Sequence, residues 1–213
     1  MRKILGVVLG VLAVGVITVP GVVFAFTNQT DTFVPRAAVT EVASLSCATG
    51  TGSNLDLSSA FSGIPSGDEE RTATNTCTAT TNSLDGYELG IDYNAGENGT
   101  LAHATSADEF AVHAGTVAVP SAISVTASEA KWGFRIGDTS ECTDSGDWGT
   151  DGAGALYAGM PADYTEISDD TTQTDQDGET CIFGFLAARG STKMLDDGYY
   201  DCNVTITMKD NTD

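Results

Sequence analysis

The chain has 213 residues, of which 30 are acidic and 9 basic, so its formal net charge is −21 at pH 7. A surface this negative repels phosphate backbones and anionic lipid head groups, which argues against nucleic-acid binding and against binding to membrane surfaces. This length suits one domain, or at most two small ones, and is ample for burying a hydrophobic core.

The first 25 residues have the three parts of a secretory signal. Two basic residues, Arg2 and Lys3, precede a long uncharged apolar run, and small residues lead up to Ala25. We therefore expect an N-terminal signal helix that is cleaved after Ala25, and an extracellular or cell-surface location. The alternative is a retained anchor, because residues 4–26 carry no charge and about 20 apolar residues suffice to cross a bilayer. If this segment is not cleaved, it is the only part through which the protein is expected to meet the membrane.

Two further parts of the chain follow the signal. Residues 26–38 contain Pro35 and show no helical periodicity, which predicts an extended N-terminal segment or a linker. From Val39 onward polar and apolar residues begin to alternate, so we expect residues 39–213 to form one domain.

This domain is predicted to be all-β. Alternation with period two, typical of half-buried strands, recurs at roughly 10-residue intervals. The chain has 24 glycines and no convincing long helical pattern. We therefore expect an Ig-like or jelly-roll-like antiparallel β-sandwich. Its clearest candidate strands are residues 39–47, 71–81, 87–93, 131–136, 181–187 and 198–208.

The order of these strands along the chain predicts two antiparallel pairs. Residues 71–81 and 87–93 are separated by a short turn sequence, which favours direct pairing. Residues 181–187 and 198–208 are expected to form a hairpin with a long loop.

Three further expectations concern individual segments. Residues 101–118 are predicted to be mostly strand, although a capping pattern at Ser106 would also allow a short helix. In the strand 131–136, Arg135 is expected on the solvent face because the aromatic residues occupy the other face. Residues 137–159, rich in Gly, Asp, Ser and Thr, are predicted to form a surface loop.

Five cysteines in an exported chain indicate disulfides, because oxidising compartments let such bonds persist. Cys47 and Cys77 fall on inward positions of neighbouring strands. A bond between them would close the loop from one to the other and stabilise the folded protein by roughly 3 to 4 kcal/mol. Cys142 with Cys181 is the second expected pair, which leaves Cys202 as a buried thiol. A bond between Cys181 and Cys202 is the alternative. No C-x-x-C occurs and neither histidine lies near a cysteine, which argues against a zinc site.

The acidic loops raise the question of calcium. Asp175–Glu179 resembles part of a calcium-binding loop, which needs clustered oxygen ligands. The full pattern requires a glutamate at its twelfth position, where this chain has Gly184 or Leu186, depending on the residue from which the loop is counted. A solvated loop is therefore the simpler interpretation, with calcium kept as an alternative. No other cofactor and no metal-ligating residue is predicted.

No catalytic constellation is recognisable, so we expect a protein that is not an enzyme. The sequence contains no G-x-S-x-G elbow and no H-E-x-x-H motif. It has only two histidines, so few residues could serve as the base of a catalytic triad. Paired carboxylates are uninformative among 30 acidic residues.

Three asparagines are candidate glycosylation sites. Asn28, Asn98 and Asn203 each begin an N-x-T triplet, which an exporting cell can modify.

Two parts of the sequence resemble known secreted proteins. The stretch GVVFAFTNQT at residues 21–30 resembles the signal-to-mature junction of camelysin/TasA-type fibre subunits. That resemblance implies a secreted β-sandwich that polymerises through an N-terminal donor strand. It covers about ten residues, Asn28 stands where aspartate is more usual, and the following Asn-x-Phe type stretch is absent. Short motifs are also similar to landmarks of bacterial or archaeal surface sandwiches, namely Gly86–Leu89, Trp132–Phe134, Gly198–Tyr200 and Val204–Thr207.

Together these features predict a secreted structural protein of the cell surface, either a fibre- or pilus-like subunit or an adhesin. It would act by scaffolding, and residues 26–38 would add a strand to the sheet edge of a neighbour. The expected partners are other copies of the chain, cell-surface proteins or glycans. The alternative function is a calcium-dependent extracellular carbohydrate-binding module.

Overall fold

The structure is a computed structural model that describes residues 41–49, 55–57, 60–61, 64–94, 97–137, 140–142, 147–150 and 152–211. The predicted signal with its cleavage position at Ala25, the segment 26–38 and the candidate site Asn28 lie outside the described residues.

All regular structure in the described residues is β. Ten strands form there, and no helix does. None of the described segments therefore meets the requirement for a membrane-spanning helix. The strands are β1 (Ala43–Cys47), β2 (Glu69–Thr81), β3 (Tyr87–Tyr93), β4 (Leu101–His103), β5 (Glu109–Val112), β6 (Ala130–Ile136), β7 (Thr165–Asp170), β8 (Glu179–Arg189), β9 (Tyr200–Asp201) and β10 (Val204–Asp210).

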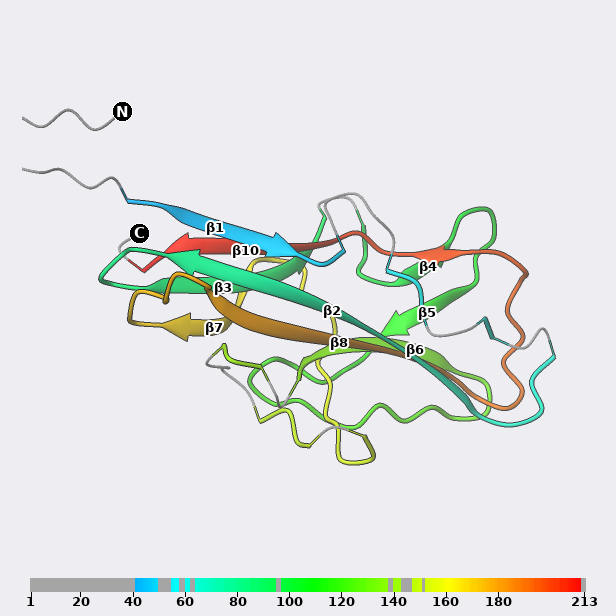
Figure 1. The fold of residues 1–213 in the computed structure, drawn as a ribbon. Coiled ribbons are helices and arrows are strands. Elements are labelled where there is room, and N and C mark those ends of the chain that lie inside the picture. Colours follow the sequence, from blue (N-terminus) through cyan, green and yellow to red (C-terminus); the bar gives the residue numbers. More distant parts are fainter. Residues whose placement is uncertain are drawn as a thin grey trace, which may run out of the picture. The chain divides into compact units, whose positions relative to one another are not determined.

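These strands form two sheets of unequal size (Figure 1). The larger sheet has the order β1-β2-β8-β6-β5-β4-β9, and the smaller one has the order β10-β3-β7. Every pair is antiparallel except β5 and β6, which run parallel. One hydrophobic core joins Leu89 and Ile91 of the smaller sheet to Phe134 and Phe183 of the larger sheet. The predicted β-sandwich is thus confirmed.

The central position of β8 explains its apolar sequence. This strand lies between β2 and β6 and is buried on both faces. Phe183 faces the main core, whereas Leu186 and Ala188 belong to a second cluster with Ala155 and Tyr157. A strand covered on both faces has no solvent side, so polar and apolar residues cease to alternate.

The two predicted strand pairings are wrong. β2 and β3 lie in different sheets, so the turn at Gly86 carries the chain across the sandwich instead of closing a hairpin. The predicted strand 198–208 is interrupted at Cys202 and Asn203, and its parts, β9 and β10, also belong to different sheets. β8 pairs with β2 and β6 instead. Alternation shows which face a strand buries, but it does not identify the neighbour along its edge.

Two residues are more buried than the sequence pattern predicts. Arg135 is only 3% exposed, and its guanidinium donates from Nε to the Ile136 carbonyl at 3.1 Å. Trp148, in the predicted surface loop, is 3% exposed and packs against Phe134 with ring centroids 5.6 Å apart. Part of the segment 137–159 therefore folds back onto the core.

Candidate functional site

Two strand edges face each other in a lateral seam, which we define as the facing edges of β1 and β10. Each is an end strand of its sheet, and Figure 1 shows them lying side by side. Neither strand pairs with the other in a hydrogen-bonded ladder.

The hydrogen-bond phase of β10 shows which of its backbone groups are turned away from β3. The Asn94 amide donates to the Asn203 carbonyl at 3.1 Å, immediately before β10 pairs with β3. In an antiparallel ladder, residues alternate between facing the partner and facing away from it. Val204, Ile206 and Met208 therefore direct their N–H and C=O groups away from β3, towards the seam.

The same reasoning applies to β1. The Ala48 amide donates to the Thr76 carbonyl at 2.7 Å, so alternate residues from Ala48 backwards face β2. Ala43, Leu45 and Cys47 then direct their backbone groups away from β2. Within the part of the chain that the structure describes, neither of these two edges is hydrogen-bonded to a further strand.

Apolar side chains that are half buried occur on both strands of the seam. Leu45 and Cys47 of β1 pack partly against the core, as do Val204, Ile206 and Met208 of β10. Half-buried apolar side chains beside unpaired strand edges are the combination that strand addition uses, because main-chain bonds give affinity and side-chain pockets give specificity.

Disulfides fix the strands behind this seam. The structure joins Cys47 to Cys77 and Cys142 to Cys181, which are the two pairs expected from the sequence. Cys47, Cys77 and Cys181 lie in one row across β1, β2 and β8. The first bond holds the edge strand β1 on β2, and the second holds the segment around Cys142 on β8. Two disulfides are compatible with an oxidising extracellular environment.

The fifth cysteine, Cys202, is a half-buried free thiol. Its Sγ donates a hydrogen bond to Glu97 Oε2 at 3.6 Å. Burial, together with the Glu97 carboxylate, raises the pKa of the Cys202 thiol to about 12. The alternative bond between Cys181 and Cys202 is not formed, because Cys181 is already bonded to Cys142. A thiol with so high a pKa is a poor nucleophile at neutral pH.

Two carboxylates in or beside the acidic loops accept hydrogen bonds from turn amides. Asp175 Oδ1 accepts the Asp177 amide at 2.9 Å, and Asp170 Oδ1 accepts the Thr172 amide at 2.9 Å. Glu179 accepts the phenolic O–H of Tyr87 at 2.6 Å, and burial raises the pKa of this carboxyl. No group of three or more His, Cys, Asp or Glu side chains that could hold a metal ion occurs among the residues that the structure describes.

An acidic depression of about 630 Å³ lies by the smaller sheet. It is open to solvent and is lined by Asp85, Glu88, Asp169, Thr171 and Asn211. Asn211 Nδ2 donates to Asp169 Oδ1 at 2.8 Å. Carboxylate and amide groups of this kind can accept hydrogen bonds from sugar hydroxyls.

A serine–histidine contact was not predicted. His113 Nε2 lies 2.9 Å from Ser121 Oγ, and it also lies 3.1 Å from the Ser121 carbonyl. Burial lowers the pKa of His113, which is 9% exposed. The Ser121 amide donates to the Tyr157 carbonyl at 2.9 Å, so it is not free to stabilise an oxyanion. We interpret the contact as a structural link between neighbouring loops.

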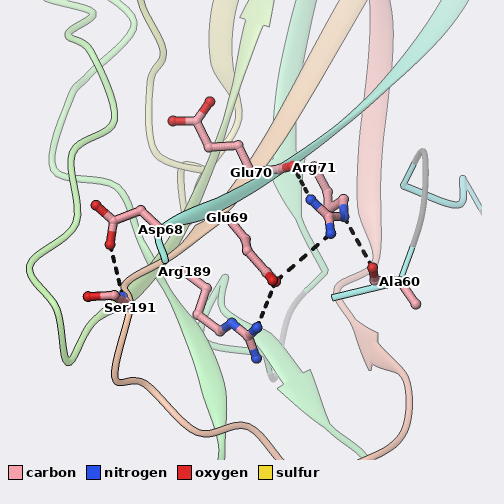
Figure 2. Close-up of polar contacts among 7 residues, drawn as sticks. All are labelled: Ala60, Asp68, Glu69, Glu70, Arg71, Arg189 and Ser191. Atoms are coloured by element: carbon pink, nitrogen blue, oxygen red, sulfur yellow. Dashed lines mark hydrogen bonds and ion pairs between the residues drawn. The ribbon is translucent and has the colours of Figure 1, made fainter. Parts of the chain in front are cut away.

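Another polar cluster missed by the sequence analysis joins β2 to β8 (Figure 2). Arg189 Nη2 donates to Glu69 Oε2 at 2.6 Å, and Arg71 Nη2 lies 3.9 Å from the same oxygen. Both guanidinium groups lie over the Phe61 ring, 5.1 Å from its centroid for Arg71 and 5.5 Å for Arg189. The available signal was the spacing of Glu69 and Arg71, which places opposite charges on one face of a strand.

Both described glycosylation candidates, Asn98 and Asn203, are exposed.

Comparisons with known proteins give no relatives. No protein family matches the chain, and no match was found among curated proteins or solved structures.

Proposed function

We propose that this chain is an exported structural protein of the cell surface, a fibre- or pilus-like subunit or an adhesin, which assembles by strand addition. The observation that carries the proposal is the lateral seam, where half-buried apolar side chains lie beside strand edges that pair with no further strand among the described residues. The secretion signal and the resemblance of residues 21–30 to the junction of fibre subunits support the same conclusion. No catalytic residue is assigned.

In this proposal residues 26–38 of one copy lie along the free edge of β10 in the next copy. Thirteen residues in extended form span roughly 43 Å, which is more than the length of a seven-residue strand such as β10. Residues 30–34 (TDTFV) are rich in β-branched and aromatic side chains, and Pro35 would end the added strand.

The edge of β10 is a better acceptor than the edge of β7. β7 carries Glu166, Asp169 and Asp170 within six residues. Charged side chains on an edge strand oppose strand addition, whereas the only charges on β10 are Lys209 and Asp210 at its end. β10 is therefore the preferred acceptor edge of the smaller sheet.

The test compares residues 26–213 with residues 39–213 by light scattering and electron microscopy. We expect oligomers or fibres only from the longer protein. A synthetic peptide of residues 26–38 in excess should cap β10 and block growth, whereas a scrambled peptide should not. A longer protein that remains monomeric at high concentration contradicts assembly by strand addition.

A variant of the acceptor edge provides a second arm. Val204→Pro removes an N–H that points away from β3, so the β3–β10 ladder retains its bonds while strand addition loses one donor. We expect this variant to fold, as judged by its melting curve, and to polymerise poorly. Unchanged polymerisation would show that β10 is not the acceptor.

The second candidate function, a calcium-dependent carbohydrate-binding module, is favoured by the acidic depression lined by Asp85, Glu88 and Asp169. Calorimetry at millimolar calcium tests the metal, and a glycan array tests the sugar. Loss of a glycan signal in Asp169→Asn would locate binding in this depression. Titrations without heat and an array without hits would exclude this function.

A further inference from the structure

The two described N-x-T triplets differ in their hydrogen bonding, although they have the same sequence pattern. In the first, Asn98 Oδ1 accepts hydrogen bonds from the Thr100 amide at 3.3 Å and from Thr100 Oγ1 at 2.7 Å. Gly99 has a φ of +72°, and its carbonyl accepts the indole N–H of Trp132 at 2.9 Å. The turn is therefore anchored to the core while Asn98 itself is exposed.

In the second triplet the same groups are engaged elsewhere. The side-chain Nδ2 of Asn203 donates to Glu97 Oε1, and the backbone N–H of Asn203 donates to Glu97 Oε2 at 2.9 Å. Thr205 Oγ1 donates to Asn94 Oδ1 at 2.7 Å. This hydroxyl therefore does not donate to the side-chain amide oxygen of Asn203. Modification of Asn203 in the folded protein would first have to break a hydrogen bond to a carboxylate.

We propose that Asn98 carries an N-linked glycan and that Asn203 remains unmodified in the folded protein. The hydroxyl of Thr100 donates to the amide oxygen of Asn98, which draws electron density towards oxygen and makes an Nδ2 proton easier to remove. The inference rests on the export half of the proposed function and is independent of assembly.

The donor in this reaction is a sugar linked through phosphate to a membrane lipid, and the catalyst is a glycosyltransferase of the exporting cell. Asn98 Nδ2 attacks the anomeric carbon, so a C–N bond forms while the bond from that carbon to the phosphate oxygen breaks. The lipid phosphate leaves with the bonding electron pair. Nδ2 loses one proton to a base of the transferase, which leaves a neutral secondary amide.

The surroundings of Asn98 provide room for the attached sugar. An open depression of about 450 Å³ is lined by Glu97, Asn98, Thr100, Ala102 and Asp201. The carboxylates of Glu97 and Asp201 can accept hydrogen bonds from the hydroxyl groups of the first sugar.

Glycopeptide mass spectrometry of the protein exported by its own cell tests the proposal. We expect occupancy at Asn98 to be at least roughly tenfold that at Asn203, which corresponds to breaking one hydrogen bond to a charged group. Asn98→Gln should abolish the main glycoform, and Thr100→Ser should retain it because serine preserves the hydroxyl. Exported protein without a glycan, or with equal occupancy at both sites, overturns the proposal and leaves export itself established.

Glu97→Ala tests whether hydrogen bonding, rather than the N-x-T sequence, sets the glycan occupancy of Asn203. This variant leaves both triplets intact but removes the acceptor that holds Asn203 Nδ2. We expect it to raise occupancy at Asn203 towards that at Asn98. If Asn203 stays unmodified both in a folded Glu97→Ala protein and in a folded Asn94→Ala/Glu97→Ala protein, neither its hydrogen bonds to Glu97 nor the engagement of Thr205 by Asn94 protects it, and the geometric argument fails.

Discussion

Glu69 neutralises a buried arginine, and its removal should be costly. Arg189 is 1% exposed and Glu69 is 15% exposed, with 2.6 Å between Nη2 and Oε2. Glu69→Ala leaves the Arg189 charge buried without this carboxylate, a change that typically costs about 3–5 kcal/mol. The Phe61 ring contacts Arg189 in both proteins, so its contribution cancels, and we expect a loss of about 3–5 kcal/mol.

Urea denaturation with both disulfides intact measures this loss. The matched control is Glu70→Ala, because the neighbouring Glu70 side chain is exposed and its removal should change the free energy of unfolding by less than about 0.5 kcal/mol. In the double variant Glu69→Ala/Arg189→Met the buried charge is gone, so stability should largely recover. A Glu69→Ala protein as stable as the Glu70→Ala protein would refute the argument that Arg189 depends on this ion pair.

Three further predictions concern cysteines and a histidine. Replacing both Cys142 and Cys181 by serine opens a loop with a sequence separation of 39 and should cost about 4 kcal/mol in urea denaturation, whereas a change below 1 kcal/mol would contradict the loop-closure reasoning. Cys202, whose pKa is raised to about 12, should react with iodoacetamide roughly a thousandfold more slowly in native than in unfolded protein, as followed by mass spectrometry, and equal rates would show an accessible thiolate. Burial, and then Lys131, lowers the pKa of His113 in the folded state, so the unfolded chain binds this proton first as pH falls below 6.5. Stability should therefore decrease from about pH 7 to pH 5, and His113→Gln should reduce that slope, while an identical slope in both proteins would exclude His113 as its source.

The sequence predicted several strands from their local alternation, and it favoured the two cysteine pairs that form while a bond between Cys181 and Cys202 stayed open. Alternation in 87–93 predicted β3 with its bounds, since one face of this strand is buried throughout most of its length. The inward phase of Cys47 and Cys77 likewise predicted a pair that the structure joins. For glycosylation, the sequence marked Asn98 and Asn203 as equivalent N-x-T triplets and did not distinguish them.

The tertiary structure alone decided how these elements are combined. The lateral seam exists because β1 and β10, which are far apart in the chain, become edges of different sheets. Glu69 reaches Arg189 across 120 positions, and Glu97 reaches Asn203 across 106. The alternation of polar and apolar residues along a strand shows only which face of the strand is buried. It contains no information about contacts over such separations. The identity of the edge strands, the burial of Arg189 and the difference between the two triplets therefore follow from packing.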